Sequence, residues 1–358
     1  MKRTQMISRR SFLQAAAAAA AACSALALTG CGSASPASSA AAASGEASGT
    51  VYKVGVVNYV DDASLNQIVA SLEARLDEAG AERGVTFNYA DYYSNAQADQ
   101  SNLNQIGADL VADDVDVIVA VATPSASTML AAVEDTDIPV IYSAVTDPVG
   151  AGFDGLPNIT GTSDALNTEA IMNLILSINP DLDQLGLLYD LGQDSSTQAI
   201  ADAKAFCDKH GIRYIEKNGT NTAEVQMAVE ALAASGVKVV FTPTDNTIMT
   251  AELAIYETMI EAGIQHFTGA DSFALNGAFV GYGVDYVQLG EATADMLVEL
   301  LCDGKTIADL PYRTFDNGTA TINTETCAAL GLDLETVKTA FEPYCTAIEE
   351  LVTAEEFE

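Results

Sequence analysis

The sequence contains no tryptophan and only two histidines, His210 and His266, among 358 residues. Without tryptophan, the chain lacks the large ring that could stack on a pyranose sugar. The two histidines lie far apart, and no CxxC or HExxH motif accompanies them, which argues against a zinc site. We therefore expect neither a bound metal nor a cofactor.

Positive charge is equally scarce, since 15 lysines and arginines face 50 aspartates and glutamates. Four of the basic residues lie within the first ten positions, so the rest of the chain has 11 against 50, a net charge of about −39. Such a surface repels nucleic acid and anionic lipid headgroups. The acidic excess also serves solubility, so it does not by itself identify a cationic ligand.

The first part of the chain has the features of an export signal. A basic start that includes Arg9 and Arg10 precedes an uncharged, alanine-rich run over 15–28, which is shorter than the ~20 apolar residues of a membrane span. The string SRRSFLQ (8–14) resembles the twin-arginine export consensus, and general secretion stays an alternative. The chain is therefore expected to be exported.

Residues 28–31 read Leu-Thr-Gly-Cys, which resembles a bacterial lipobox. Cys31 would then be the lipidated N-terminus, with residues 1–31 as signal peptide and lipobox, and a plain secretory signal is the alternative. Residues 32–50 are rich in Ser, Ala and Gly and predict a flexible tether. We expect a domain anchored by lipid to the extracytoplasmic face of the cell membrane.

Outside the signal and anchor, the cysteines are Cys207, Cys302, Cys327 and Cys345. An exported protein can contain disulfides, and Cys327 with Cys345 is the best candidate pair because both fall in the last helical region. Buried free thiols are the alternative.

From residue 51 onward, short runs rich in β-branched residues alternate with stretches of helical length. Strands are expected at 52–59, 85–93, 115–122 and 139–145, and in a second series at 184–191, 212–219, 237–243, 265–271 and 278–284. Helices between apolar strands indicate βαβ units and parallel sheets covered on both faces. About 300 residues exceed what one core usually organises, so two α/β lobes are expected.

Polar residues gather where the predicted strands end, which is where doubly wound sheets bind their ligands. The candidate ligand-binding residues are Tyr59, Asp61, Thr123, Ser125, Ser143, Thr146, Asp147, Asp190, Asp245, Asn246, Asp271 and Tyr282. None of the strand ends carries a recognisable catalytic pairing, and no GxSxG elbow or Walker A motif occurs. These absences favour a binding protein over an enzyme.

Several strings carry a family resemblance: NAQADQSNLNQIGADLVADDVDVIVAVATPSA (95–126), SAVTDPVGAG (143–152), TPTDNT (242–247), GADS (269–272) and GYGVDYVQLG (281–290). In order and spacing they resemble the substrate-binding lipoproteins of ABC importers related to the tryptophan and tyrosine binders. The resemblance runs from about Tyr52 to Gly331 and implies a type I periplasmic-binding fold. In that fold two Rossmann-like, doubly wound lobes close on a ligand by hinge motion. The first lobe is expected to comprise residues 51–161 with 284–310, and the second lobe residues 162–283 with 311–358.

The resemblance also implies partners. Proteins of this kind are not enzymes; they pass a small ligand to an ABC permease powered by a separate ATPase. We expect the ligand to be an amino acid, with an aromatic one considered, and the protein to be a monomer. The alternatives are a surface lipoprotein of the same fold that senses ligands or acts as an adhesin, and a nucleoside or sugar binder.

Within that fold, the start of the helix after Thr123 is expected to hold a ligand carboxylate, because hydroxyls and free N–H groups meet there. Asp147 and Asp245, with Asp271 nearby, are candidates to hold an ammonium group. Ordinary capping and turn roles are the alternatives for these residues.

The first strand departs from the family pattern. Asp61, Asp62 and Ala63 stand where many relatives have Glu, His and Pro. This loop is expected to border the side-chain pocket, so the departure leaves the ligand's side chain open. Tyr59 and Tyr282 could stack on an aromatic ligand, although tyrosine is also simply favoured in strands.

Overall fold

The computed structural model describes residues 49–315 and 318–357. The expected signal peptide, Cys31 and nearly all of the tether lie outside the described residues. Within the described part, no helix is both long and apolar enough to cross the hydrocarbon core of a membrane. Nor does that part contain a group of three or more His, Cys, Asp or Glu side chains placed to hold a metal ion.

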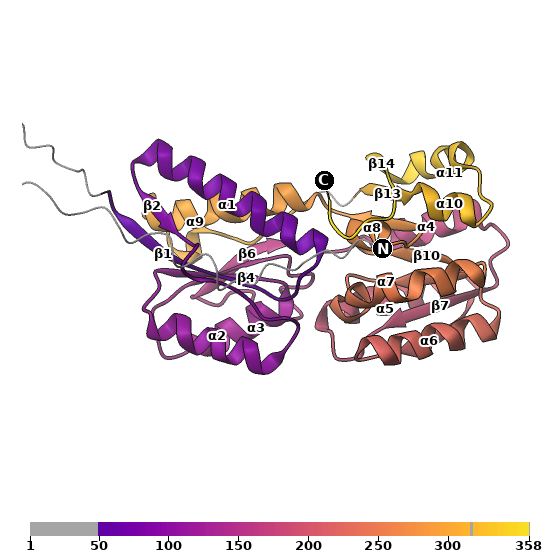
Figure 1. Ribbon diagram of the computed structural model, residues 1–358, viewed down its shortest axis with the longest axis horizontal. Coiled ribbons are helices and arrows are strands. Elements are labelled where there is room, and N and C mark those ends of the chain that lie inside the picture. The colour runs from indigo at the N-terminus through magenta and orange to yellow at the C-terminus, as the bar shows by residue number, and fades with distance from the viewer. Residues whose placement is uncertain (1–48, 316–317, 358) are drawn as a thin grey trace, which may run out of the picture. The chain divides into compact units, whose positions relative to one another are not determined.

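The first lobe is built on a seven-stranded sheet (Figure 1). Its strands are β1 (Val51–Asn58), β2 (Thr86–Asn88), β3 (Tyr93–Asn95), β4 (Val117–Val121), β5 (Val140–Ser143), β6 (Ile159–Ser163) and β12 (Arg313–Thr314). They run parallel in the order β12-β6-β5-β4-β1-β2, and β3 pairs with β1 beyond the β2 segment. The helices of this lobe are α1 (Ala63–Arg83), α2 (Gln100–Ala112), α3 (Thr123–Ala132) and α9 (Tyr286–Cys302).

The second lobe contains another seven-stranded sheet, in the order β14-β13-β11-β10-β9-β7-β8. Its strands are β7 (Gln184–Tyr189), β8 (Arg213–Asn218), β9 (Val239–Thr242), β10 (Gln265–Thr268), β11 (Val280–Gly283), β13 (Thr319–Asn323) and β14 (Ala347–Leu351). Only the pairing of β11 with β13 is antiparallel among the pairs of this sheet. Its helices are α4 (Thr168–Ile178), α5 (Asp194–His210), α6 (Thr222–Ser235), α7 (Asn246–Glu261), α8 (Asp271–Leu275), α10 (Thr324–Ala329) and α11 (Leu334–Phe341), with a 3₁₀ turn at Glu342–Tyr344; a second 3₁₀ turn, Ile307–Asp309, lies between α9 and β12 of the first lobe.

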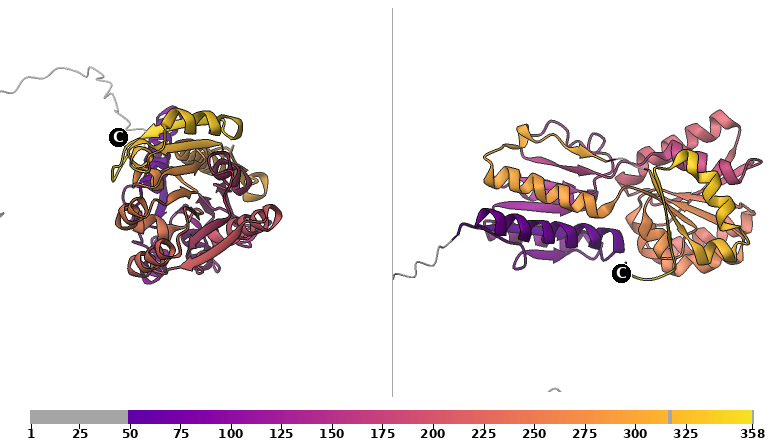
Figure 2. Two further views of the ribbon diagram at one scale, coloured as in Figure 1. Left: turned by 90° about the vertical axis from the view of Figure 1, so that its right-hand side faces the viewer. Right: turned by 90° about the horizontal axis from the view of Figure 1, so that it is seen from above.

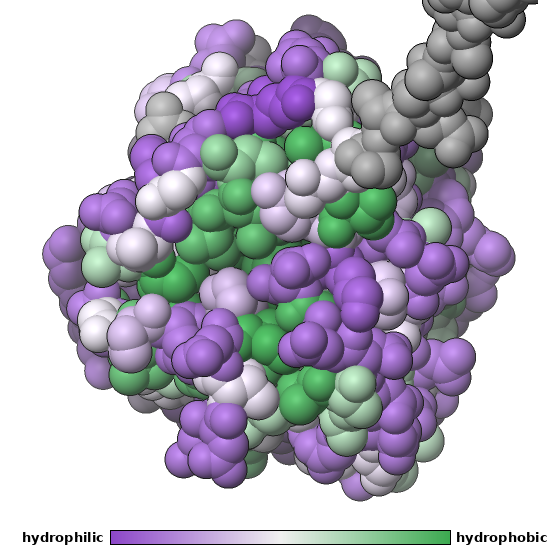
Figure 3. Space-filling model, turned by 90° about the vertical axis from the view of Figure 1, so that its left-hand side faces the viewer, coloured by the Kyte–Doolittle hydropathy of each residue, from purple (hydrophilic) through white to green (hydrophobic). Residues whose placement is uncertain are grey.

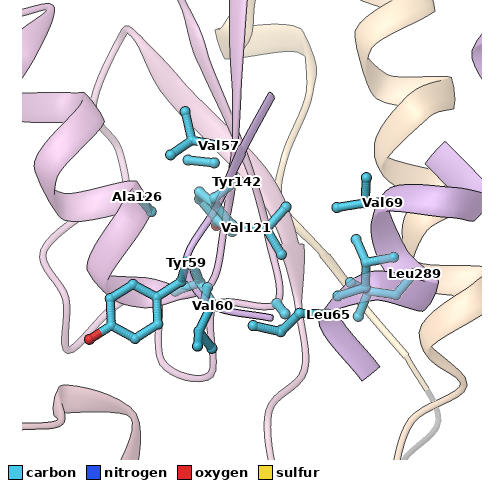
Figure 4. Packing of buried hydrophobic residues seen from close by; sticks show 14 of the residues in the cluster. Val57, Tyr59, Val60, Leu65, Val69, Val121, Ala126, Tyr142 and Leu289 are labelled. Carbon is cyan, nitrogen blue, oxygen red and sulfur yellow. The ribbon is translucent and has the colours of Figure 1, made fainter. Parts of the chain in front are cut away.

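The local sequence explains where the first helix begins and ends. The Asp62 carboxylate accepts hydrogen bonds from the N–H groups of Ser64 and Leu65, which caps the N-terminus of α1. Gly84 ends the helix in the left-handed conformation, with φ of 68°. The apolar face of α1 packs into the core of the first lobe, where Leu65 and Val69 lie near Leu289 of α9 (Figure 4).

Segments far apart in the chain complete each lobe. Helix α9 follows strand β11 of the second sheet but packs along α1 of the first lobe (Figure 2). Strand β12 pairs with β6 of the first sheet, although the expected boundary placed residues from 311 onward in the second lobe. The chain therefore passes between the sheets after β6, after β11 and after β12.

Two sequence expectations are corrected by the structure. The run 85–93 forms two short strands, β2 and β3, because the chain turns between them. The cysteines of the described part are free thiols, so Cys327 and Cys345 form no disulfide. Cys327 is buried in the core of the second lobe and Cys345 packs against the same core. Burial raises the pKa of the Cys345 thiol to about 11, which keeps it protonated and unreactive.

Candidate ligand-binding cleft

A small cavity of about 10 Å³ lies where loops of the two lobes meet. Its lining comprises Leu65, Ala122, Thr123, Ala144, Thr146, Asp164, Ser195, Thr244, Asn246, Met249 and Tyr286. Most of these residues follow the carboxyl end of a strand or begin the next helix. This is the position at which doubly wound sheets bind ligands.

Direct hydrogen bonds join the two lobes at this cavity and near it. The hydroxyl oxygens of Thr146 and Thr244 lie 3.1 Å apart. The Ser64 hydroxyl donates to the Asp271 carboxylate at 2.6 Å, and the N–H of Ser272 donates to the Ser64 oxygen at 3.2 Å. The structure therefore describes lobes that are closed over the cavity.

Two helices begin at the cavity without a side-chain cap. The residues that precede α3 and α5 are Ala122 and Gln193, and neither caps its helix with a side-chain hydrogen bond. Ala122 has φ of 74°, a conformation that is uncommon for a residue other than glycine. The first N–H groups of both helices therefore lack the usual side-chain acceptor.

Hydroxyl groups at these two helix starts are also unpartnered. The side-chain oxygens of Thr123, Ser125 and Ser195 are buried and have no hydrogen-bond partner among the residues that the structure describes. Buried hydroxyls without partners are rare in folded proteins. Together with the uncapped N–H groups, they form a site that suits an anionic oxygen ligand such as a carboxylate.

Asp164 is the one carboxylate that lines the cavity. It is 5% exposed, accepts a hydrogen bond from Thr146 at 3.0 Å and forms no ion pair with any residue of the described part. Burial raises its pKa to about 6. A buried carboxylate without a cation is costly, so this position suits a ligand ammonium group.

The hydrogen-bonding capacity of Asp245 is already used within the second lobe. Its carboxylate caps α7 through the N–H groups of Thr247 and Ile248, and it accepts the N–H of Asp190 and the hydroxyl of Ser196, both at 2.7 Å. Asp190 in turn accepts the Thr247 hydroxyl at 2.7 Å. These two carboxylates organise the loops that carry Asn246, and neither lines the cavity.

Asp147 lies in a neighbouring hollow of about 240 Å³ that also contacts Thr123 and Ser195. Its carboxylate accepts the N–H of Gly150 at 2.8 Å, as in a turn. Asp271 lies between the lobes with its hydrogen bond from Ser64. The three candidates for an ammonium contact thus occupy three different places, outside the cavity that holds Asp164.

The remaining candidates are distributed between the cleft and the two cores. Thr123, Thr146 and Asn246 line the cavity. Ser143 and Tyr282 do not line it: the Ser143 hydroxyl bonds the hydroxyls of Thr162 and Thr293, and the Tyr282 hydroxyl donates to the carbonyl oxygen of Tyr344. Asp61 is exposed, and its carboxylate accepts a hydrogen bond from the Asn66 amide. Tyr59 lies at the margin of the first core (Figure 4).

The cavity also contains residues that the sequence reasoning missed, above all Asp164, Ser195, Thr244 and Tyr286. Asp164 directly follows β6, so the rule that ligands meet strand ends would have found it. Tyr286 is the first residue of α9, which nothing in its local sequence connects to the cleft. Burial raises its pKa well above the usual value, and the nearby carboxylates of Asp164, Asp271 and Asp62 add to the rise.

The fold and the cleft define a two-lobed α/β protein that closes on a small ligand. A family model described as ABC transporter substrate binding protein matches residues 53–340. The chain therefore belongs to the family of ABC transporter substrate-binding proteins, as its sequence motifs predicted.

Relatives agree with this assignment. The chain is 28% identical over 284 residues to the tyrosine-binding protein of Clostridioides difficile strain R20291, covering 78% of this chain and 81% of that protein. A conserved domain protein of Vibrio cholerae is 28% identical, with a TM-score of 0.72 over 83% of this chain and 99% of the other.

Two further solved structures differ in their ligand state. The ABC domain from Streptococcus pneumonia in complex with L-Trp is 27% identical, with a TM-score of 0.74 over 84% of this chain and 100% of the other. A ligand-free, open substrate-binding protein with adhesive properties from Clostridium difficile is 26% identical, with a TM-score of 0.62 over 85% and 100%. These likenesses confirm the type I periplasmic-binding fold. The better match to the ligand-bound structure agrees with the closed lobes described above.

Proposed function

We propose that this chain captures a free amino acid in the cleft between its lobes. The observation that carries the proposal is one cavity that holds both an unpaired buried carboxylate, Asp164, and the unpartnered hydroxyls of Thr123 and Ser195. The ligand's ammonium group would bind Asp164, and its carboxylate would bind the hydroxyls and the uncapped starts of α3 and α5.

A zwitterion suits this cavity better than a neutral ligand. A sugar or nucleoside would leave Asp164 buried without a cation, which is costly. The side chain of the ligand would lie against Leu65, Met249 and Tyr286. With about 10 Å³ of free space in the closed structure, the cavity would have to widen to admit an amino acid. The names of the relatives, a tyrosine-binding protein and a complex with L-Trp, support the same class of ligand.

We further propose that the protein acts as a monomeric, non-enzymatic lipoprotein on the extracytoplasmic side of the membrane. Its signal sequence and lipobox support a lipid anchor at Cys31. From there it would deliver its ligand to an ABC permease with a separate ATPase. Replacement of Cys31 by Ala should abolish labelling by a lipid precursor, and labelling that persists would contradict the anchor.

A second candidate function is surface adhesion, because a solved relative is described as a substrate-binding protein with adhesive properties. The two functions are compatible if adhesion uses a surface outside the cleft. Binding of the purified protein to host cells, measured with and without an amino acid in the cleft, would separate them.

A thermal-shift screen tests the main proposal. The chain from residue 49 onward, which forms a compact unit, would be screened against amino acids, short peptides, nucleosides and sugars. An amino acid at 100 times its Kd should add ~2.7 kcal/mol to the free energy of unfolding. As controls, the N-acetyl derivative and the methyl ester of the best amino acid should lose most of this effect, since each lacks one charge. Stabilisation by sugars or nucleosides alone would contradict the proposal.

A further inference from the structure

Two carboxylates that are not part of the cavity lie where the lobes meet. Asp62 caps α1 in the first lobe and is 7% exposed, and Asp271 is the first residue of α8 in the second lobe and is partly buried. The amino-acid site described above uses neither of them. Their role in the closed protein is therefore open.

A single residue, Ser64, connects the two carboxylates across the interface. Its N–H donates to Asp62 at 2.9 Å, and its hydroxyl donates to Asp271 at 2.6 Å. The N–H of Ser272 reaches the same hydroxyl oxygen, and the buried Ser272 side chain lies beside Asp62, whose pKa it lowers. Closure of the lobes therefore brings both carboxylates to one serine in a largely dry setting.

No cation neutralises this pair. Neither Asp62 nor Asp271 forms an ion pair with a residue in the described ranges. Tyr286 on α9 faces both carboxylates, and Glu349 on β14 faces Asp271. Asp164 after β6 lies near Tyr286, so the surrounding titratable groups are neutral or acidic. Two charged carboxylates in such a place repel each other and lose their hydration, so the closed state favours the protonated form of one of them.

We infer that Asp62 and Asp271 form a proton-binding site between the lobes, so that the protein takes up a proton when it closes on its ligand. The inference rests on the proposed function only in that ligand capture closes the lobes. Asp164 does not contribute the same proton, because the ammonium group of a bound amino acid neutralises it.

The direction of the pH effect follows from the closed state. Burial raises the pKa of Asp62 to about 7, with a further rise from Asp271, and burial raises the pKa of Asp271 to about 6. In open lobes both groups face water and return towards the ordinary value of about 4. The closed state thus binds more protons, so closure weakens as pH rises. For one proton taken up on closure, the Kd of the ligand should rise about tenfold per pH unit between about pH 5 and pH 7 and then level off.

Asn substitutions test this site with little structural disturbance. Asp62→Asn can still cap α1, and Asp271→Asn can still accept the hydrogen bond from Ser64. Asp61→Asn is the matched control, since Asp61 is exposed and adjacent in sequence. Calorimetry near pH 6, with L-tyrosine or L-tryptophan in two buffers of different ionisation enthalpy, measures proton uptake. The wild type and D61N should take up about one proton, and D62N and D271N markedly less. Equal uptake in all four proteins would overturn the inference.

Small-angle scattering provides a test that needs no ligand and therefore stands even if the amino-acid proposal fails. The ligand-free wild type and D61N should have a smaller radius of gyration at about pH 5 than at about pH 8, because protonation favours closure. In D62N and D271N this difference should be reduced or lost. The same pH response in all four proteins would count against a proton site between the lobes.

Discussion

At the scale of single residues, two buried aspartates near the cleft, Asp164 and Asp245, have similarly raised pKa values but different roles. Burial raises the pKa of Asp164 and of Asp245 to about 6 in both cases. Asp245 receives four hydrogen bonds from its own lobe, whereas Asp164 receives one from a side chain, that of Thr146. Asp245 therefore stabilises the fold, and Asp164 retains capacity for a ligand.

Substitution should separate these two roles. Asp164→Asn should weaken amino-acid binding by about 10- to 100-fold, since a hydrogen bond to a charged group contributes about 1.5–3 kcal/mol. It should change the free energy of unfolding little. Asp245→Asn should instead lower the free energy of unfolding by about 1–2 kcal/mol through the loss of a charged cap. Calorimetric titration and denaturant unfolding of both variants check this, and unchanged affinity in D164N would contradict the ammonium contact.

The unpartnered hydroxyls give a second prediction at this scale. Thr123→Val keeps the shape of the side chain but removes a buried hydroxyl that has no partner in the ligand-free protein. Affinity should fall about 3- to 10-fold, as expected for one hydrogen bond of about 1 kcal/mol, while stability stays equal or rises. Thr162→Val is the control, because its hydroxyl bonds Thr293 at 2.8 Å. That variant should lose stability and keep its affinity, and the opposite pattern would refute the carboxylate site.

At the scale of elements, the packing of α1 against α9 ties the returning chain to the first lobe. Both helices present apolar side chains to one core, and Gly290 lies against α1, where an added methyl group would overlap the Ile68 carbonyl and the Ser71 hydroxyl. Because α9 shares this core with α1, their contact matters for the stability of the whole first lobe. The outer surface of the lobe shows an apolar area framed by hydrophilic side chains (Figure 3).

Gly290→Ala should separate these two helices. Although alanine is the better helix former, the overlap with backbone atoms of α1 should lower the free energy of unfolding by about 1–3 kcal/mol. Glu291→Ala, at the next and exposed position of α9, is the control and should change stability by less than about 0.5 kcal/mol. Urea unfolding measures both, and a G290A variant as stable as the control would show that the helices can move apart freely.

Sequence periodicity predicted the elements well, because strand and helix lengths follow from local patterns. It predicted the side chains of the cleft less well. Thr146 and Ser143 both follow or end β5, yet Thr146 lines the cavity and Ser143 points to Thr293 of α9. Neighbouring strand residues face opposite sides of a sheet. The position at which a strand ends can therefore be predicted from sequence, whereas the side of the sheet that each side chain faces depends on the register of the strand.

At the scale of the whole molecule, the contacts between lobes were beyond sequence reasoning because they depend on closure. Asp164 and Tyr286 reach one cavity from segments that lie about 120 positions apart, next to the chain crossings after β6 and β11. The same closure places Asp62 beside Asp271. Local patterns cannot encode such pairs, whereas the order of strands and the family motifs were sufficient to predict two lobes.

The pair Thr146 and Thr244 allows closure itself to be tested. Their hydroxyl oxygens are 3.1 Å apart across the cleft, so cysteines at both positions should come within reach of a disulfide when the lobes close. The oxidised T146C/T244C variant should exchange bound amino acid at least tenfold more slowly than the same protein after reduction, because the ligand cannot leave closed lobes. Dissociation rates measured by competition, with the cross-link verified by mass spectrometry, check this, and the T146C single variant controls for the loss of the hydroxyl. Fast exchange in the verified cross-linked protein would mean that the ligand site lies outside this cleft.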